Sequence, residues 1–127
     1  MLFRRMLSLL LLLTFTAASL PAEAFHPGAV HGDILEVHAE ERKVRVAAPG
    51  GLLILELRPD CRLVRGCQPV TASALRPVKE GWYQDALFVL DSEGRVVEAI
   101  VNYTIREEAG FLVLYDIFGN IKMQEPI

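Results

Sequence analysis

From residue 30 onward the chain alternates short apolar runs with turn residues. Lys43 to Ala48 alternates strictly between polar and apolar side chains, a period of two that is typical of a half-buried strand. Pro49-Gly50-Gly51 then predicts a hairpin. The next run, Leu52 to Leu57, is apolar on both faces except at Glu56, which is the pattern of a covered central strand.

The same spacing continues along the rest of the chain. The first strand shows a slip in its apolar period, which indicates a bulge. Thr71 to Leu75 is the one helix-like stretch, and residues after Asn120 form a short polar tail. About seven strands with little helix predict an all-β fold, a single small closed or nearly closed barrel of OB-like meander type with one short helical turn. The further strands are expected at Val30 to Val37, Cys61 to Val64, Trp82 to Leu90, Arg95 to Ile105 and Phe111 to Ile117, with turns at Arg58-Pro59-Asp60 and Asp91-Ser92-Glu93-Gly94.

The first 24 residues have the features of an export signal. Arg4 and Arg5 precede an apolar run from Leu7 to Leu20, and Ala22-Glu23-Ala24 supplies small residues where a signal peptidase reads. An uncleaved anchor is less favoured because the run is shorter than the ~20 residues that span a bilayer. We therefore expect a signal peptide over residues 1–24 and a secreted or periplasmic mature domain over residues 25–127.

The charge of the mature chain excludes some partners. The full chain has 13 Lys and Arg against 16 Asp and Glu, and the leader contains Arg4, Arg5 and Glu23, which leaves 11 against 15, a net charge of −4. Proteins that grip nucleic acid need a basic stripe to neutralise phosphates. We therefore expect no nucleic-acid partner, no membrane insertion after cleavage, and a partner in the envelope or outside the cell.

Cys61 and Cys67, the two cysteines of the chain, allow three interpretations. A regular hairpin turning at Arg65-Gly66 would set them roughly 10 Å apart along the strands, beyond the ~7 Å between Cα atoms that a disulfide needs. A compact loop from Arg62 to Gly66 would allow the bond. A metal site is the least favoured, because the close C-x₂-C spacing is absent. The disulfide and the pair of free thiols both stay open.

The three histidines, His26, His31 and His38, all lie near the start of the mature chain. After cleavage at Ala24, the His26 ring, its amide and the free amine could hold copper, which favours nitrogen donors. The alternative is that all three are ordinary surface residues. His31 and His38 would face opposite sides of a regular strand, unless the bulge restores a common face.

Few other residues suggest chemistry. Asp85 stands among apolar neighbours, either as a buried acid or pointing outward while Gln84, Ala86 and Phe88 point inward. Trp82 and Tyr83 could stack on a ligand or serve as core aromatics. The chain has no recognisable nucleophile motif, so we expect neither an enzyme nor a cofactor.

A series of short motifs runs along the stretch from Val30 to Asn102. They are Gly32-Asp33-Ile34-Leu35-Glu36-Val37, Val44 to Ala48, Pro59-Asp60, Arg65-Gly66 and Ser73-Ala74-Leu75. In these motifs the stretch resembles a family of exported bacterial domains of unknown function with a small OB-like barrel. Cys61 departs from the family pattern, where a Thr is usual, and Phe111 to Ile117 extends past it. The resemblance implies export and a barrel fold but no activity.

These observations together predict a non-enzymatic exported module that binds a partner or has a structural role in the cell envelope. Metal binding through the His-containing N-terminus is the alternative function.

Overall fold

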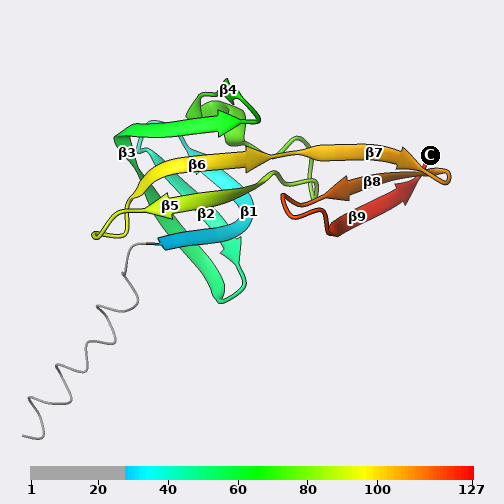
Figure 1. Ribbon diagram of the computed structural model, residues 1–127, viewed down its shortest axis with the longest axis horizontal. Coiled ribbons are helices and arrows are strands. Elements are labelled where there is room, and N and C mark those ends of the chain that lie inside the picture. The colour runs from blue at the N-terminus through cyan, green and yellow to red at the C-terminus, as the bar shows by residue number, and fades with distance from the viewer. Residues whose placement is uncertain (1–27) are drawn as a thin grey trace, which may run out of the picture.

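The computed structural model describes residues 28–127, so the expected signal peptide and His26 lie outside the described residues. The described chain is a β-barrel followed by a three-stranded sheet that extends to one side (Figure 1). The predicted all-β barrel with one short helical turn is confirmed. Its elements are β1 (Gly28–His38), β2 (Lys43–Ala48), β3 (Gly51–Arg65), β4 (Gln68–Pro69), the 3₁₀ turn η1 (Ala72–Leu75), β5 (Asp85–Leu90), β6 (Val96–Asn102), β7 (Thr104–Glu108), β8 (Phe111–Tyr115) and β9 (Ile121–Pro126).

The barrel closes because β2 pairs with both β1 and β3. The sheet runs β2-β1-β5-β6-β3-β4, and the additional β2–β3 pairing closes the first five of these strands into a ring, with β4 attached to β3 outside it. β3 and β6 run parallel, so the strand order is not that of a simple meander. The side chains that fill the ring are almost entirely apolar, with Ile34, Leu57, Phe88 and Val96 among the most deeply buried.

The first strand carries the predicted bulge. The register of its pairing with β2 shifts between Ile34 and Glu36. The first half of β1 pairs with β5, and the second half pairs with β2. Gly32 lies where these two pairings meet. A Cβ at this position would stand 2.5 Å from Val46 Cγ1 and 2.6 Å from the Ala47 carbonyl oxygen, so the approach of β2 requires a glycine here.

β3 is one long strand, where the sequence predicted two strands separated by a turn at Arg58-Pro59-Asp60. Those residues form a bend inside β3, and the pairing with β6 shifts between Leu57 and Arg62. The Arg42 side chain holds the bend, since its guanidinium donates to the Leu57 carbonyl at 3.3 Å and to the Arg58 carbonyl at 2.7 Å. A turn was predicted because Pro59 cannot donate a backbone hydrogen bond, but a long-range side chain satisfies the bend instead.

Three further boundaries differ from the predicted ones. Trp82 forms only an isolated bridge with Lys79, and the strand begins at Asp85. The predicted strand from Arg95 to Ile105 divides at Tyr103 into β6 and β7. The expected polar tail is strand β9, which pairs antiparallel with β8. The many polar side chains of this stretch predicted a tail, but they also suit a strand that has little apolar surface to bury.

Two hairpins of the chain use the same turn. Asp91 Oδ1 accepts the amide hydrogens of Glu93 and Arg95, each at 2.9 Å. Asp116 Oδ1 does the same for Phe118 and Asn120, at 2.9 and 2.8 Å. A glycine with positive φ completes each turn, because the backbone there is left-handed. The pattern D-x-x-G-x thus builds both the β5–β6 and the β8–β9 connections.

We predict that Gly32→Ala lowers the free energy of unfolding by about 2 kcal/mol, because the added methyl group overpacks against β2. The matched control is Gly50→Ala at the β2–β3 turn, where a Cβ would meet nothing within 4 Å. Its effect should stay within about 0.5 kcal/mol. Urea denaturation of the two variants measures the difference, and equal stabilities would contradict the close approach of β1 and β2.

Candidate functional site at the junction of barrel and sheet

Asp85 is the most deeply buried charged residue among those described, with no exposed surface. Its neighbours Ala86 and Phe88 lie in the barrel core, and the β5 backbone directs Asp85 to the opposite, outer face. The C-terminal sheet covers it there. The sequence offered burial and outward orientation as alternatives, and the structure combines them.

The Asp85 carboxylate accepts hydrogen bonds from three parts of the chain. His31 Nε2 of β1 lies 2.7 Å from Oδ2, and the amide of Ile117 donates to the same oxygen at 2.9 Å. Asn102 Nδ2 of β6 donates to Oδ1 at 2.9 Å and also to the Tyr115 carbonyl at 3.0 Å. A buried carboxylate is stable only when such partners replace water. Here these partners also join the barrel to the sheet.

Lys122 of β9 brings a positive charge to the same junction. Its Nζ lies 2.6 Å from Asp33 Oδ1 and 3.7 Å from Asp85 Oδ1, and it donates to the Tyr83 carbonyl at 2.8 Å. The side chain is mostly buried, so water competes little with these contacts. The His31 ring packs edge-on against Phe118, with ring centroids 4.8 Å apart.

A shallow hollow lies beside this cluster, lined by His31, Gly32, Asp33, Ala47, Ala48, Pro49, Asp116 and Lys122. Burial acts to raise the pKa of Asp116, but the amide hydrogens of Asn120 and Phe118 and the Asn120 side chain outweigh it. The pKa of this carboxyl therefore lies below its ordinary value. None of the lining residues carries a hydroxyl or thiol that the His31–Asp85 pair could activate. The contacts of His31, Lys122 and Asp85 instead join the barrel to the sheet.

The two aromatic candidates for ligand stacking have different surroundings, since Trp82 is buried and Tyr83 is partly exposed. Trp82 is almost fully buried, and Lys79 Nζ lies 4.6 Å from its ring centroid. Lys79 also bonds Glu125 of β9 at 3.2 Å, which makes a second contact between barrel and sheet. The Tyr83 carbonyl holds Lys122. Trp82 therefore packs as a core aromatic, and stacking on a ligand stays a prediction for the partly exposed Tyr83 ring.

The histidines do not come together in a metal site. His31 and His38 are seven positions apart on β1, roughly 20 Å along the strand. His31 pairs with Asp85, and His38 Nε2 lies 2.8 Å from Glu36 Oε1 on the surface. No group of three metal-ligating side chains occurs within residues 28–127. The bulge places His31 and His38 on the same outer face of β1, but their separation along the strand and their different partners leave them in separate environments. The predicted copper site at His26 lies outside the described residues.

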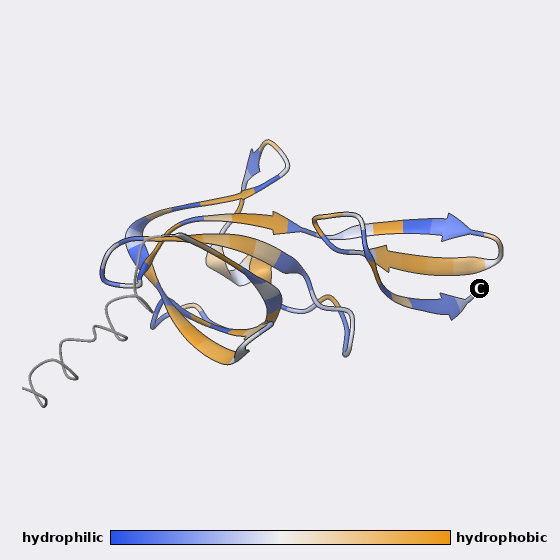
Figure 2. Ribbon diagram, turned by 60° about the horizontal axis from the view of Figure 1, so that its bottom comes forward, coloured by the Kyte–Doolittle hydropathy of each residue, from blue (hydrophilic) through white to orange (hydrophobic). Residues whose placement is uncertain are grey.

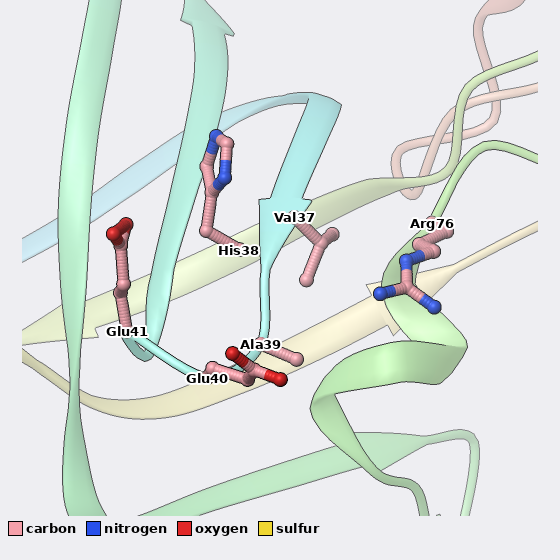
Figure 3. A pocket seen from close by; sticks show the side chains of 6 residues that line it. All are labelled: Val37, His38, Ala39, Glu40, Glu41 and Arg76. Atoms are coloured by element: carbon pink, nitrogen blue, oxygen red, sulfur yellow. The ribbon is translucent and has the colours of Figure 1, made fainter.

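His38 instead lines a second hollow at the β1–β2 turn, together with Val37, Ala39, Glu40, Glu41 and Arg76. In Figure 3 the His38 ring and the Arg76 guanidinium lie on opposite sides of this hollow, on β1 and after η1. The two glutamates and the arginine stand apart from one another and face solvent, as ordinary surface charges do. They do not converge on a common site.

The two cysteines are free thiols in the structure, so the candidate disulfide between Cys61 and Cys67 is not formed. Arg65 pairs with Gln68, which makes Gly66 and Cys67 the two-residue turn of a regular hairpin. Cys61 lies four residues before Arg65, roughly 13 Å along β3, beyond the ~7 Å between Cα atoms that a disulfide spans. The turn is one residue later than predicted, and the plain hairpin is the alternative that the structure adopts.

Sequence reasoning missed Asn102 and Lys122 as members of the junction. The sequence pattern indicated an ordinary strand residue at Asn102 and placed Lys122 in a polar tail. The repeated D-x-x-G-x pattern was the available signal, because a second turn of the Asp91 kind at Asp116 requires a strand after it. That strand is the one that carries Lys122.

No family model matches this chain, and the search of curated proteins finds no significant relative. No helix among residues 28–127 is long and apolar enough to span a membrane.

We predict that Asp85→Ala lowers the free energy of unfolding by about 3 kcal/mol, because His31, Asn102 and the Ile117 amide lose a buried partner. The matched control is Glu36→Ala, whose carboxylate contacts His38 on the exposed surface and should contribute less than about 1 kcal/mol. Thermal and urea unfolding at neutral pH measure both. Equal losses would show that the junction contributes no more than a surface pair.

The thiols should differ in reactivity. Burial raises the pKa of Cys61 to about 11, so its thiolate is scarce at pH 8, whereas Cys67 is exposed on the turn. Iodoacetamide at pH 8 should modify Cys67 first and Cys61 only after unfolding, and Cys67→Ser should remove the fast phase. Titration of the unfolded, unreduced protein should count two thiols, and a count of none would restore the disulfide.

Proposed function

We propose that this chain is an exported, non-enzymatic β-barrel module that binds a partner protein in the cell envelope or outside the cell. The exported origin rests on the leader pattern of residues 1–24, and the likeness to exported OB-like domains agrees with it. The barrel supplies a rigid scaffold, and the C-terminal sheet is fixed to it by the Asp85 junction.

The observation that carries the proposal is an apolar surface on the β2–β3 hairpin. Leu52 and Ile54 are 62% and 71% exposed, and neighbouring Leu53 is 38% exposed. The sequence predicted a covered central strand here, and the described chain leaves it uncovered. Adjacent exposed apolar side chains are unusual on a monomeric protein and typically mark an interaction surface.

The polar junction supports binding over catalysis. Asp85 directs its carboxylate to His31, Asn102 and a backbone amide, and Lys122 contacts Asp33 and a carbonyl. Side chains engaged in this way hold the fold together and are not presented to a substrate. By contrast, the apolar side chains of the hairpin are presented to solvent within the described chain.

Site-specific photo-crosslinking tests the proposal. Benzoylphenylalanine at Ile54, introduced in the cells that express the protein, should give a discrete adduct in the extracytoplasmic fraction. The matched control is the same group at Glu107, an exposed position on β7 that lies outside the hairpin. Adducts that are absent from both positions, or equal at both, would contradict a binding surface on the hairpin.

A further inference from the structure

Within residues 28–127, the first half of β3 has an open edge. β3 pairs with β2 over Gly51–Glu56, while its other neighbour, β6, joins it only from Leu57 onward. The Leu57 amide donates to the Arg42 carbonyl at 2.7 Å, and alternate residues of an antiparallel ladder bond toward the same side. Counting from Leu57 toward the start of β3, every second residue therefore forms its backbone hydrogen bonds with β2. The backbone groups of Leu52, Ile54 and Glu56 point to the open side.

The open edge is also the apolar part of the surface. Figure 2 shows the strand of this hairpin as an orange, hydrophobic ribbon at the outside of the barrel. Leu52 and Ile54 project from the outer face, and Leu53 projects from the other face at the open end of the barrel. An unpaired edge with apolar side chains on both faces is a template for another strand.

The free edges on β4, β7 and β9 carry features that block strand addition, whereas the free edge of β1 over Gly28–Gly32 does not. Charged side chains and prolines are the usual means, because they either resist desolvation or lack a backbone donor. The stretch from Leu52 to Leu55 has neither. The blocking residues are Arg106, Glu107 and Glu108 on β7, Lys122, Glu125 and Pro126 on β9, and Pro69 on β4.

The charges around the hairpin permit a second copy of the same acidic chain to approach. Glu56 faces Lys43 across the β2–β3 ladder. Arg45 Nη1 lies 3.9 Å from Glu36 Oε2, which balances the next pair along the outer face. The hairpin face is therefore close to neutral, whereas the chain as a whole has a net charge of −3. Charge repulsion between two copies is therefore small where these hairpins meet.

We propose that two copies of this chain dimerise by pairing their β3 edges antiparallel about a two-fold axis, which joins two barrels through one continuous sheet. The inference rests on the proposed function and names its partner as a second copy. In the register that keeps apolar residues together, Leu53 of one copy faces Leu53 of the other, and Leu52 faces Ile54. Glu56 then lies opposite Gly50 of the second copy, so the two Glu56 carboxylates stand at opposite ends of the interface. Such a self-complementary contact is what two-fold symmetry requires.

Sedimentation equilibrium on the chain in the form that the cells accumulate tests the dimer. Wild-type protein should show twice the chain mass at tens of micromolar, and Ile54→Lys should weaken association by about 10-fold or more, because it places a charge in the strand interface. The matched control is Ile121→Lys, an equally exposed residue at 59% on the already charged β9, which should leave the dimer unchanged. A wild-type monomer at all concentrations, or a dimer indifferent to Ile54→Lys, would overturn the proposal.

The register is tested separately, so that a folding defect in one variant does not decide the question. In a background with Cys61→Ser and Cys67→Ser, Leu53→Cys should give a disulfide-linked dimer on mild oxidation. Facing residues outside the hydrogen-bonded pairs bring their Cβ atoms to about 4.5–5.5 Å. Ile105→Cys on β7 is the control and should stay monomeric. A Leu53→Cys variant that cross-links no faster than this control would overturn the register.

The two proposals fail in different ways. An adduct from position 54 to another protein, with purified chain that stays monomeric, would overturn self-pairing and leave partner binding in place. The absence of any adduct from position 54 would contradict both.

Discussion

A single buried carboxylate, that of Asp85, decides how the two halves of this protein fit together. It lies on the outer face of a barrel strand, where a charge would ordinarily meet water. An imidazole and an amide side chain of the barrel, together with a backbone amide of the C-terminal sheet region, replace that water. The cost of removing a charge from solvent is offset only when all these partners are present at once. The barrel and the sheet are therefore interdependent, because each would leave polar groups of the junction without partners if the other were absent.

The barrel itself could be predicted from the sequence, because period-two alternation and Pro-Gly turns act locally. β2 was predicted with its observed boundaries, and the bulge of β1 followed from a slip in its apolar spacing. Features that depend on distant partners could not be predicted in this way. The bend of β3 is held by Arg42, and the burial of Asp85 comes from residues more than thirty positions later.

The candidate site shows the same division between local and distant causes. The outward direction of Asp85 followed from strand alternation, but its partners did not, since Lys122 lies on a strand whose polar pattern resembled a tail. The most instructive error concerns Leu52 to Leu57. An apolar run on both faces was taken as a covered strand, although the same pattern also suits a strand that is left uncovered within one chain. Periodicity reports how apolar a strand is, and it does not report what covers the strand.

The parallel pairing of β3 with β6 has a consequence for the order in which the molecule can form. β1, β2 and β3 come first in the chain, but the ring cannot close until β6 is available to lie between β3 and β5. Contacts between segments so far apart in sequence form slowly, because the entropy of closing a long loop is lost before strand pairing stabilises the chain. The partners of Asp85 at residues 117 and 122 follow the whole barrel in the chain. A barrel that has formed before β9 is in place exposes the junction carboxylate, so docking of the C-terminal sheet completes the fold.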